Sequence, residues 1–143
     1  MRCGELVKAL EMMKTHVQTT TPDATLAQAI DLMDLYQTPS LPVINEFEQM
    51  VGILSERDIL NAVKEFGAER AKNLTVAEVT TNQVVCVHEH QNVENILETL
   101  FDGKWKRMPV VTDEGKLIGI LNRVDVLQAL FEGSISDEFP DPV

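Results

Sequence analysis

The sequence has little that would suggest a membrane, secreted or disulfide-bonded protein. No stretch approaches the roughly 18 consecutive apolar residues of a membrane-spanning helix. Residues 1–5 lack the pattern of a signal peptide, so a cytoplasmic location is expected. The two cysteines, Cys3 and Cys86, are isolated, which argues against a disulfide framework and fits a reducing compartment.

Basic residues are also scarce. Lysine and arginine number 12 against 23 aspartates and glutamates, which gives a net charge of −11. Such a charge repels nucleic-acid backbones and anionic membranes at long range, so neither is expected as a partner. A local basic pocket could still hold a small anion, and three of the 12 basic residues do stand together in residues 104–107.

The signatures of catalysis and of metal binding are weak. The chain has no recognisable set of nucleophile, base and orienting residue, and no glycine-rich phosphate loop, so it is expected not to be an enzyme. Cys86, His88 and His90 would point the same way from a strand and could bind zinc. No second cluster of ligands accompanies them, so a solvated strand end is the favoured interpretation and no metal is expected.

What the chain does have is an internal repeat. Residues 17–67 align without a gap with residues 84–134 at a constant offset of 67, and ten aligned positions are identical. Two copies are too few for a solenoid. We therefore expect two equivalent halves that pack about a pseudo-twofold axis and form clefts between them.

Each repeat is predicted to have the order β-α-β-β-α. In the first, Thr25 and Gln28 match a capping box at the start of a helix with one apolar face. In the second, Asn92 is the predicted N-cap of the equivalent helix. The predicted strands are 17–21, 41–44 and 50–54, then 84–88, 108–112 and 117–121, and the second helices are 56–66 and 123–131. Residues 68–73 are predicted to be a polar linker, and 6–13 and 76–79 to be equivalent lead-in segments.

This pattern resembles a tandem pair of CBS domains (cystathionine-β-synthase type repeats), which together make a Bateman module. The motifs that carry the resemblance are Leu-Pro-Val-Ile at 41–44 with Gly-Ile-Leu-Ser-Glu-Arg-Asp-Ile-Leu at 52–60, and their counterparts at 108–111 and 119–127. It implies an α+β fold with repeats at 8–67 and 75–134, residues 1–134 forming one module, and a loose acidic tail at 135–143. No catalytic domain is expected beside the pair.

The resemblance also implies a function. CBS pairs commonly bind adenosine compounds in clefts between the repeats, so AMP, ADP or ATP is the expected regulatory ligand, with S-adenosylmethionine or NAD as alternatives. In the family, a Ser/Thr-x-x-Asp motif of one repeat holds ribose and phosphate. The expected partners are a second copy of the chain, in a homodimer, and an effector protein supplied in trans.

The first cleft should be the stronger site. Ser55 and Asp58 match the Ser/Thr-x-x-Asp motif, and the family places phosphate ligands where Lys106 and Arg107 stand. A hydroxyl and a helix start suit a phosphate, and a carboxylate suits a ribose diol. The predicted residues of this cleft are Ile53, Ser55, Arg57, Asp58, Val85, Cys86, Lys106, Arg107 and Pro109.

The second cleft departs from the family pattern. Asn122 replaces the hydroxyl residue, although Asp125 remains, and the partner segment around Ser40 carries no cation. Ribose binding is still possible, whereas polyphosphate binding is in doubt. The predicted residues of this weaker cleft are Gln18, Thr19, Ser40, Pro42, Asn122, Val124 and Asp125.

Two alternatives to nucleotide sensing remain open. The Ser55 and Asp58 side chains would also make an ordinary helix cap, which needs no ligand. The chain would then be a dimerisation or interaction scaffold. A metal sensor that uses the region of Cys86 and His88 is the weaker alternative.

Overall fold

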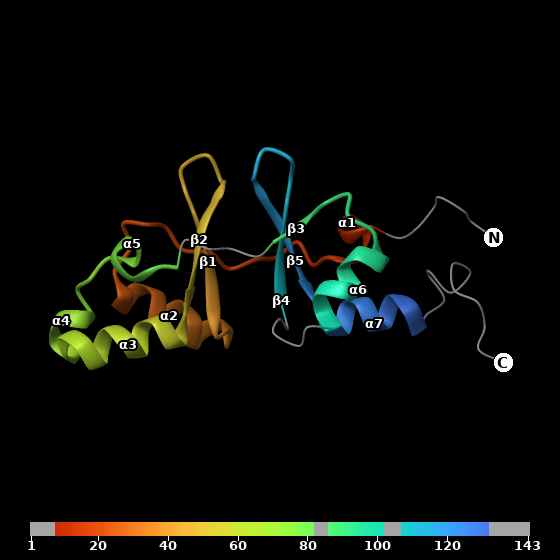
Figure 1. Cartoon of the computed structure of the whole chain (residues 1–143). Coiled ribbons are helices and arrows are strands. Elements are labelled where there is room, and N and C mark those ends of the chain that lie inside the picture. The colour runs from red at the N-terminus through yellow and green to blue at the C-terminus, as the bar shows by residue number, and fades with distance from the viewer. Residues whose placement is uncertain (1–7, 82–85, 102–106, 132–143) are drawn as a thin grey trace, which may run out of the picture. The chain divides into compact units, whose positions relative to one another are not determined.

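The structure is a computed structural model that describes residues 8–81, 86–101 and 107–131. Within these ranges the chain forms two compact units, each built from separate segments. The repeat-one unit contains residues 18–81 with 115–117, and the repeat-two unit contains residues 8–17, 86–101, 107–114 and 118–131 (Figure 1). Helices and strands are mixed in both, so the α+β class is confirmed.

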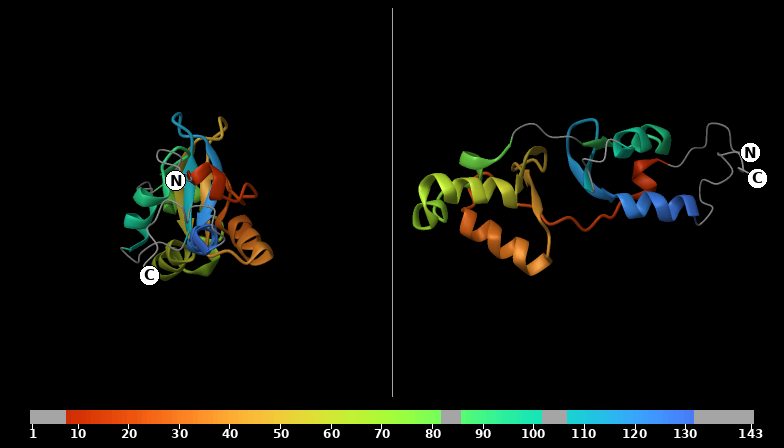
Figure 2. Two further views of the ribbon diagram at one scale, coloured as in Figure 1. Left: turned by 90° about the vertical axis from the view of Figure 1, so that its right-hand side faces the viewer. Right: turned by 60° about the horizontal axis from the view of Figure 1, so that its bottom comes forward.

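The repeat-one unit is a two-stranded hairpin covered by helices. Strands β1 (Ser40–Ile44) and β2 (Met50–Ser55) pair antiparallel, with Leu41 opposite Leu54. Helices α2 (Leu26–Tyr36), α3 (Glu56–Phe66), α4 (Ala68–Ala71) and α5 (Val76–Val79) gather on one side of this hairpin (Figures 1 and 2). Leu41 and Leu54 are completely buried in the shared core, so burial of the strands' apolar positions holds the helices in place.

Local sequence features mark where helices α2 and α3 of this unit begin or end: a capping box at the start of α2 and a glycine at the end of α3. Thr25 Oγ1 accepts a hydrogen bond from Gln28 N at 3.2 Å, and Gln28 Oε1 accepts one from Thr25 N at 3.0 Å, which completes the predicted capping box. Helix α3 ends at Gly67, whose φ of +83° strongly favours glycine. Its N–H donates to Val63 O at 2.8 Å and satisfies one of the last carbonyls of the helix.

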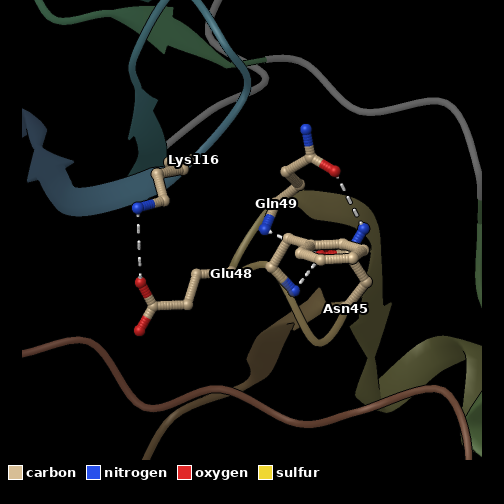
Figure 3. Close-up of polar contacts among 5 residues, drawn as sticks. Asn45, Glu48, Gln49 and Lys116 are labelled. Atoms are coloured by element: carbon tan, nitrogen blue, oxygen red, sulfur yellow. Dashed lines mark hydrogen bonds and ion pairs between the residues drawn. The ribbon is translucent and has the colours of Figure 1, made fainter.

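The turn between β1 and β2 is held by side chains and by a second segment. Asn45 Oδ1 accepts from the backbone N–H groups of Phe47 and Gln49 at 2.9 and 3.0 Å. Residues 115–117 pair with this turn: Met50 N donates to Gly115 O and Leu117 N to Glu48 O, both at 3.0 Å. Lys116 Nζ lies 3.9 Å from Glu48 Oε2, an exposed ion pair (Figure 3).

The repeat-two unit has the same plan with one more strand. Strand β3 (Val87–His88) is parallel to β4 (Arg107–Val111), which is followed by β5 (Leu117–Asn122) in the order β3-β4-β5. Helices α1 (Ala9–Met12), α6 (Val93–Phe101) and α7 (Arg123–Phe131) lie to one side of this sheet (Figures 1 and 2). Asn92 Oδ1 accepts from Asn95 N at 3.2 Å, which confirms the predicted N-cap of α6.

Each repeat packs on the lead-in helix of the other. Ala9 of α1 is buried in the repeat-two unit, where its N–H donates to Gln91 O at 2.9 Å. Val76 of α5 is buried in the repeat-one unit, where its N–H donates to Ala24 O at 2.8 Å. Ala9 and Val76 are 67 residues apart, and so are Ala24 and Gln91, so these residues occupy equivalent positions of the repeat. In both units, therefore, a repeat packs against the lead-in helix of the other repeat. The compact units therefore differ from the continuous repeats of the sequence.

Two sequence predictions are wrong. The predicted strand 17–21 is reduced to an isolated parallel bridge of Thr20 with Val43, because only Thr20 exchanges backbone hydrogen bonds with β1. The predicted linker 68–73 contains helix α4, since Ala68–Ala71 consists of good helix formers and Ala71 is buried at 2% exposure. The equivalent strand of the second repeat is predicted at 84–88. The structure has a strand there, β3, at Val87–His88, and residues 84 and 85 lie outside the described ranges.

Candidate functional site

The start of helix α3 places a carboxylate among three donors. Asp58 Oδ2 accepts from Ser55 N and from Ser55 Oγ, both at 2.9 Å, while Ser55 Oγ accepts from Asp58 N at 3.2 Å. The other oxygen, Asp58 Oδ1, accepts from Thr81 Oγ1 at 3.5 Å, the limit of a hydrogen bond. Asp58 is half-buried. One oxygen is thus fixed by the helix cap, and the other has only a weak partner among the described residues.

The start of helix α7 repeats this geometry with different chemistry. Asp125 Oδ2 accepts from Asn122 N at 3.2 Å, as Asp58 Oδ2 does from Ser55 N. Asp125 Oδ1, however, lies 3.6 Å from the ammonium group of Lys14, and the Asp125 side chain is only 7% exposed. Within the described part of the chain, Asn122 Oδ1 is buried and has no hydrogen-bond partner. The second carboxylate is therefore ion-paired and more deeply buried than the first.

Thr81 and Lys14 were not among the predicted site residues, although a sequence signal for them exists. They are 67 residues apart, as are Asp58 and Asp125, so they occupy the same position of the repeat. Both follow a lead-in helix and bridge to the second strand: Ile53 N donates to Thr81 O at 3.2 Å, and Lys14 and Ile120 exchange two hydrogen bonds of 2.9 and 2.8 Å. Extending the repeat alignment into the lead-ins would have paired them.

Two glycines, Gly52 on β2 and Gly119 on β5, allow the lead-in segments to lie close to these strands. A Cβ on Gly52 would clash with Thr80 Cγ2 and would lie 3.0 Å from Thr81 O. A Cβ on Gly119 would clash with Met13 Sδ and would lie 2.9 Å from Lys14 O. Glycine at these positions therefore lets Thr81 and Lys14 reach the two carboxylates.

The other residues predicted for the first cleft fall into both units. Ile53, half-buried in β2, and Arg57, exposed in the first turn of α3, belong with Ser55 and Asp58 to the repeat-one unit. In the repeat-two unit, Cys86 is half-buried, Arg107 is exposed at the start of β4, and Pro109 is buried within it. Burial raises the pKa of the Cys86 thiol, which keeps it protonated at neutral pH. Val85 and Lys106 lie outside the described residues.

The residues predicted for the second cleft are divided in the same way. Gln18 and Thr19 are half-buried in the repeat-one unit, and β1 contributes Ser40 and the buried Pro42. In the β1–β2 pairing Ser40 is opposite Ser55, and Pro42 is opposite Ile53. The repeat-two unit holds Asn122 and Asp125 with Val124, whose side chain is 55% exposed.

Three further features of the described residues concern a metal site, a membrane-spanning helix and an apolar pocket. The described ranges contain no group of three His, Cys, Asp or Glu side chains that could hold a metal ion, and these ranges include Cys86, His88 and His90. In the same ranges no helix is long and apolar enough to cross a bilayer. An apolar groove of about 340 Å³ between α2 and α3 is lined by Leu26, Ile30, Ile59 and Val63, and no predicted site residue lines it.

Comparison with known proteins identifies the repeats. A family model described as the CBS domain matches residues 7–65 and 76–132. An inosine-5′-monophosphate dehydrogenase from Methanocaldococcus jannaschii is 36% identical over 121 residues, which cover 85% of this chain and 23% of that protein. The protein MK0525 of Methanopyrus kandleri is 29% identical over 118 residues, 82% of this chain and 60% of its own length. The chain thus spans less than two thirds of these two relatives.

Solved structures agree with this assignment. The structure of CBSX2 in complex with AMP is 26% identical, has a TM-score of 0.74, and covers 87% of this chain and 96% of its own. A structure of CBSX2 from Arabidopsis thaliana is 25% identical with a TM-score of 0.75, covering 87% of this chain and 94% of its own. The two matched segments fall on the two sequence repeats and together take up most of the chain, so it belongs to the CBS-domain family as a tandem CBS pair.

Proposed function

We propose that this tandem CBS pair is a regulatory module that binds an adenosine nucleotide and is not itself an enzyme. AMP, ADP or ATP is the proposed ligand, and S-adenosylmethionine or NAD are the alternatives with the same adenosine core. The relative CBSX2, alike over 87% of this chain, has been solved in complex with AMP. The observation that most supports this proposal is the hydrogen bonding of Asp58 at the start of α3. One carboxylate oxygen is held in the helix cap, and the other has only a long hydrogen bond from Thr81.

The proposed role of Asp58 is to accept hydrogen bonds from the ribose. An ionised carboxylate has about four acceptor positions, and the described residues donate three hydrogen bonds to Asp58, of which the Thr81 bond is long. A ribose hydroxyl can share or replace the Thr81 contact at Oδ1 without breaking the helix cap at Oδ2. Ser55 and Ile53, at the end of β2, are proposed to line the same position.

The proposed phosphate ligands are basic residues of both repeats. Arg57 stands in the first turn of α3, and Lys106 and Arg107 precede or begin strand β4. Arginine can bind phosphate with two parallel hydrogen bonds, and lysine contributes a point charge. In a chain with a net charge of −11, such a local cluster is needed for an anion to bind. Val85, Cys86 and Pro109 are proposed to contact the base.

The proposed regulatory step is a ligand-dependent change that a partner protein detects. A ligand can shift a conformational equilibrium only by its difference in affinity for the two states. We propose that the nucleotide biases the arrangement of the CBS repeats, or of two chains in a homodimer, and that an effector protein in trans responds to it.

Calorimetric titration with AMP, ATP, NAD and S-adenosylmethionine tests this function. The wild type should bind one of them saturably, and Asp58→Ala should weaken binding by about tenfold or more, because hydrogen bonds to a charged acceptor are lost. Asp58→Ala also breaks a capping box, so Gln28→Ala, which breaks the box of the equally long helix α2, is the matched control. The control loses the hydrogen bond from Thr25 N, so it should lose about 0.5–1.5 kcal/mol of stability and keep its affinity.

A second candidate function is an interaction scaffold without a ligand. It is favoured by one observation: the Ser55–Asp58 capping box is complete without any ligand. In that case none of the four compounds produces heat or a thermal shift. Asp58→Ala and Gln28→Ala would then differ only in stability.

A further inference from the structure

Lys14 and Thr81 are equivalent lead-in residues, and they give the two carboxylates different neighbours. Thr81 offers Asp58 a neutral hydroxyl at 3.5 Å, and Lys14 offers Asp125 an ammonium group at 3.6 Å. The repeat relation makes this an internal comparison, because the carboxylates and the backbone bridges of the lead-ins are equivalent, although the cap residues Ser55 and Asn122 differ. The inference drawn from it rests on the proposed nucleotide-binding function.

The position of Lys14 is fixed by the fold. Its backbone N–H donates to Ile120 O at 2.9 Å, and its backbone oxygen accepts from Ile120 N at 2.8 Å. Gly119, just before Ile120, keeps the lead-in pressed against β5. These contacts hold the Lys14 backbone beside β5. Its ammonium group, on a side chain that is 62% exposed, lies 3.6 Å from the Asp125 carboxylate.

A ribose would compete poorly for this carboxylate. The hydroxyls of a ribose are neutral donors, whereas the ammonium group of Lys14 carries a full charge and forms an ion pair with Asp125 at 3.6 Å. The Asp125 side chain is only 7% exposed, and a buried carboxylate that loses its cation is destabilised. Displacing Lys14 therefore costs free energy that binding at Asp58 does not require.

The cap residue of α7 also differs from that of α3. Ser55 Oγ both donates to and accepts from Asp58, whereas Asn122 Oδ1 is buried and lacks a partner among the described residues. The NH₂ group of Asn122 can still donate hydrogen bonds, so this difference does not by itself exclude a phosphate. What disfavours a nucleotide at α7 is therefore the ion pair of Lys14 with Asp125.

We propose that Lys14 occupies the ribose-binding position at Asp125, so that the chain binds one nucleotide, at Asp58. Lys14 is then the residue that determines the stoichiometry of the tandem pair.

The proposal is tested by replacing Lys14 with threonine, the residue type of its repeat equivalent Thr81. Lys14→Thr should raise the calorimetric stoichiometry for AMP from one to two per chain, with the original affinity unchanged. Lys72→Thr is the matched control, since Lys72 is also an exposed lysine paired with a carboxylate, Glu69, at 3.0 Å. The control should keep a stoichiometry of one. A wild type that binds two nucleotides, or a Lys14→Thr variant that still binds one, overturns the proposal.

The reciprocal exchange tests it in the other unit and does not depend on the folding of Lys14→Thr. Thr81→Lys should place a cation beside Asp58 and weaken adenosine binding by about tenfold or more. Adenosine is the probe here because it has the ribose diol but no phosphate that the new lysine could attract. Unchanged adenosine affinity in Thr81→Lys contradicts the proposal.

These outcomes are distinct from a failure of the proposed function. If wild type and both exchanges bind neither adenosine nor AMP, nucleotide sensing is wrong and this proposal falls with it. If the wild type binds one AMP and Lys14→Thr loses it while still binding adenosine, nucleotide sensing stands. Lys14 would then be a phosphate ligand, and the proposed blocking role would be wrong.

Discussion

Asp58 and Asp125 occupy the same position in two related repeats but have different surroundings. Both begin a helix after the second strand of a hairpin, and both accept a hydrogen bond from the N–H three residues earlier. Asp58 is half-buried beside a threonine, whereas Asp125 is buried beside a lysine. After a duplication, a residue in a lead-in segment can therefore help to give two copies of the same carboxylate different chemistry.

The cores should behave alike even where the helix starts do not. Leu54 and Leu121 are repeat equivalents with 0% and 1% exposure. Leu54→Ala and Leu121→Ala should each lower the free energy of unfolding by about 2–5 kcal/mol, because each removes buried methyl groups and leaves a cavity. Urea denaturation followed by circular dichroism measures this. A loss in one variant that is several-fold smaller than in the other would break the equivalence of the two units.

The two close-approach glycines should differ in cost. Alanine at Gly52 meets Thr80, whose hydroxyl donates to Val76 O at 2.6 Å and fixes the side chain. Both alanines also approach a backbone oxygen, Thr81 O at 3.0 Å and Lys14 O at 2.9 Å, so the difference rests on the side chains. The side chain beside Gly119 is Met13, which is flexible and can move aside. Gly52→Ala should cost about 2–3 kcal/mol and Gly119→Ala about 1 kcal/mol, within the range for overpacked interiors. The order of the two urea midpoints is the result to check, and the reverse order would contradict the packing argument.

Substitutions of the two N-cap residues should differ in their stability cost by a smaller amount, and the cost should be larger for Ser55 than for Asn122. Ser55→Ala removes hydrogen bonds in both directions with Asp58 and should cost about 1 kcal/mol. Asn122→Ala removes an amide whose buried oxygen lacks a partner among the described residues, so it should cost close to zero. Thr25→Ala, which breaks the cap of α2, is the control and should resemble Ser55→Ala. Equal losses in Ser55→Ala and Asn122→Ala would mean that the two caps are equivalent after all.

The smallest expected effect concerns Cys86, whose repeat equivalent is Thr19. Burial raises the pKa of the Cys86 thiol in the folded chain, so the folded state keeps a proton that the unfolded state has lost. Its contribution to stability is therefore complete below the unfolded pKa and is lost as the pH rises from there through the folded pKa.

In a Cys3→Ser background, iodoacetamide should therefore alkylate Cys86 more slowly in the folded than in the unfolded chain at pH 8, because the thiolate is the reactive form. Cys86→Thr, which installs the residue of the first repeat, should remove this part of the pH dependence of stability. Equal alkylation rates in the two states would contradict the direction of the pKa shift.

Most of the fold could be predicted from local patterns. Helical spacing located α2 and α6, and the side chains of Thr25 and Asn92 marked where they begin. Short apolar runs after the repeat's helix located the hairpins. These features are local, because capping and amphipathic periodicity depend on residues within one or two turns.

The failures came from segments whose structure depends on distant residues. Residues 17–21 have the composition of a strand, but only Thr20 pairs with β1. Residues 68–73 read as polar, yet Ala71 packs into the core of the repeat-one unit. Composition alone could not reveal that one side chain among six would be buried.

The candidate site shows the same division. The Ser55–Asp58 pair is visible in the sequence because its residues are three apart, as a capping box requires. Thr81 is 23 residues from Asp58, and Lys14 is 111 residues from Asp125. Nothing local connects such pairs, and only the offset of the repeat could have suggested them.

The sequence by itself determined the duplication, the order of helices and strands, the CBS family and the identity of the two carboxylates, because each depends on residue type and near-neighbour spacing. Only the tertiary structure decided that each repeat packs on the lead-in of the other. That exchange brings Lys14 to Asp125 and Thr81 to Asp58, because Gly52 and Gly119 let the lead-ins lie against the second strands. The different chemistry of the two carboxylates is therefore a property of the packing, which the sequence of either repeat alone does not contain.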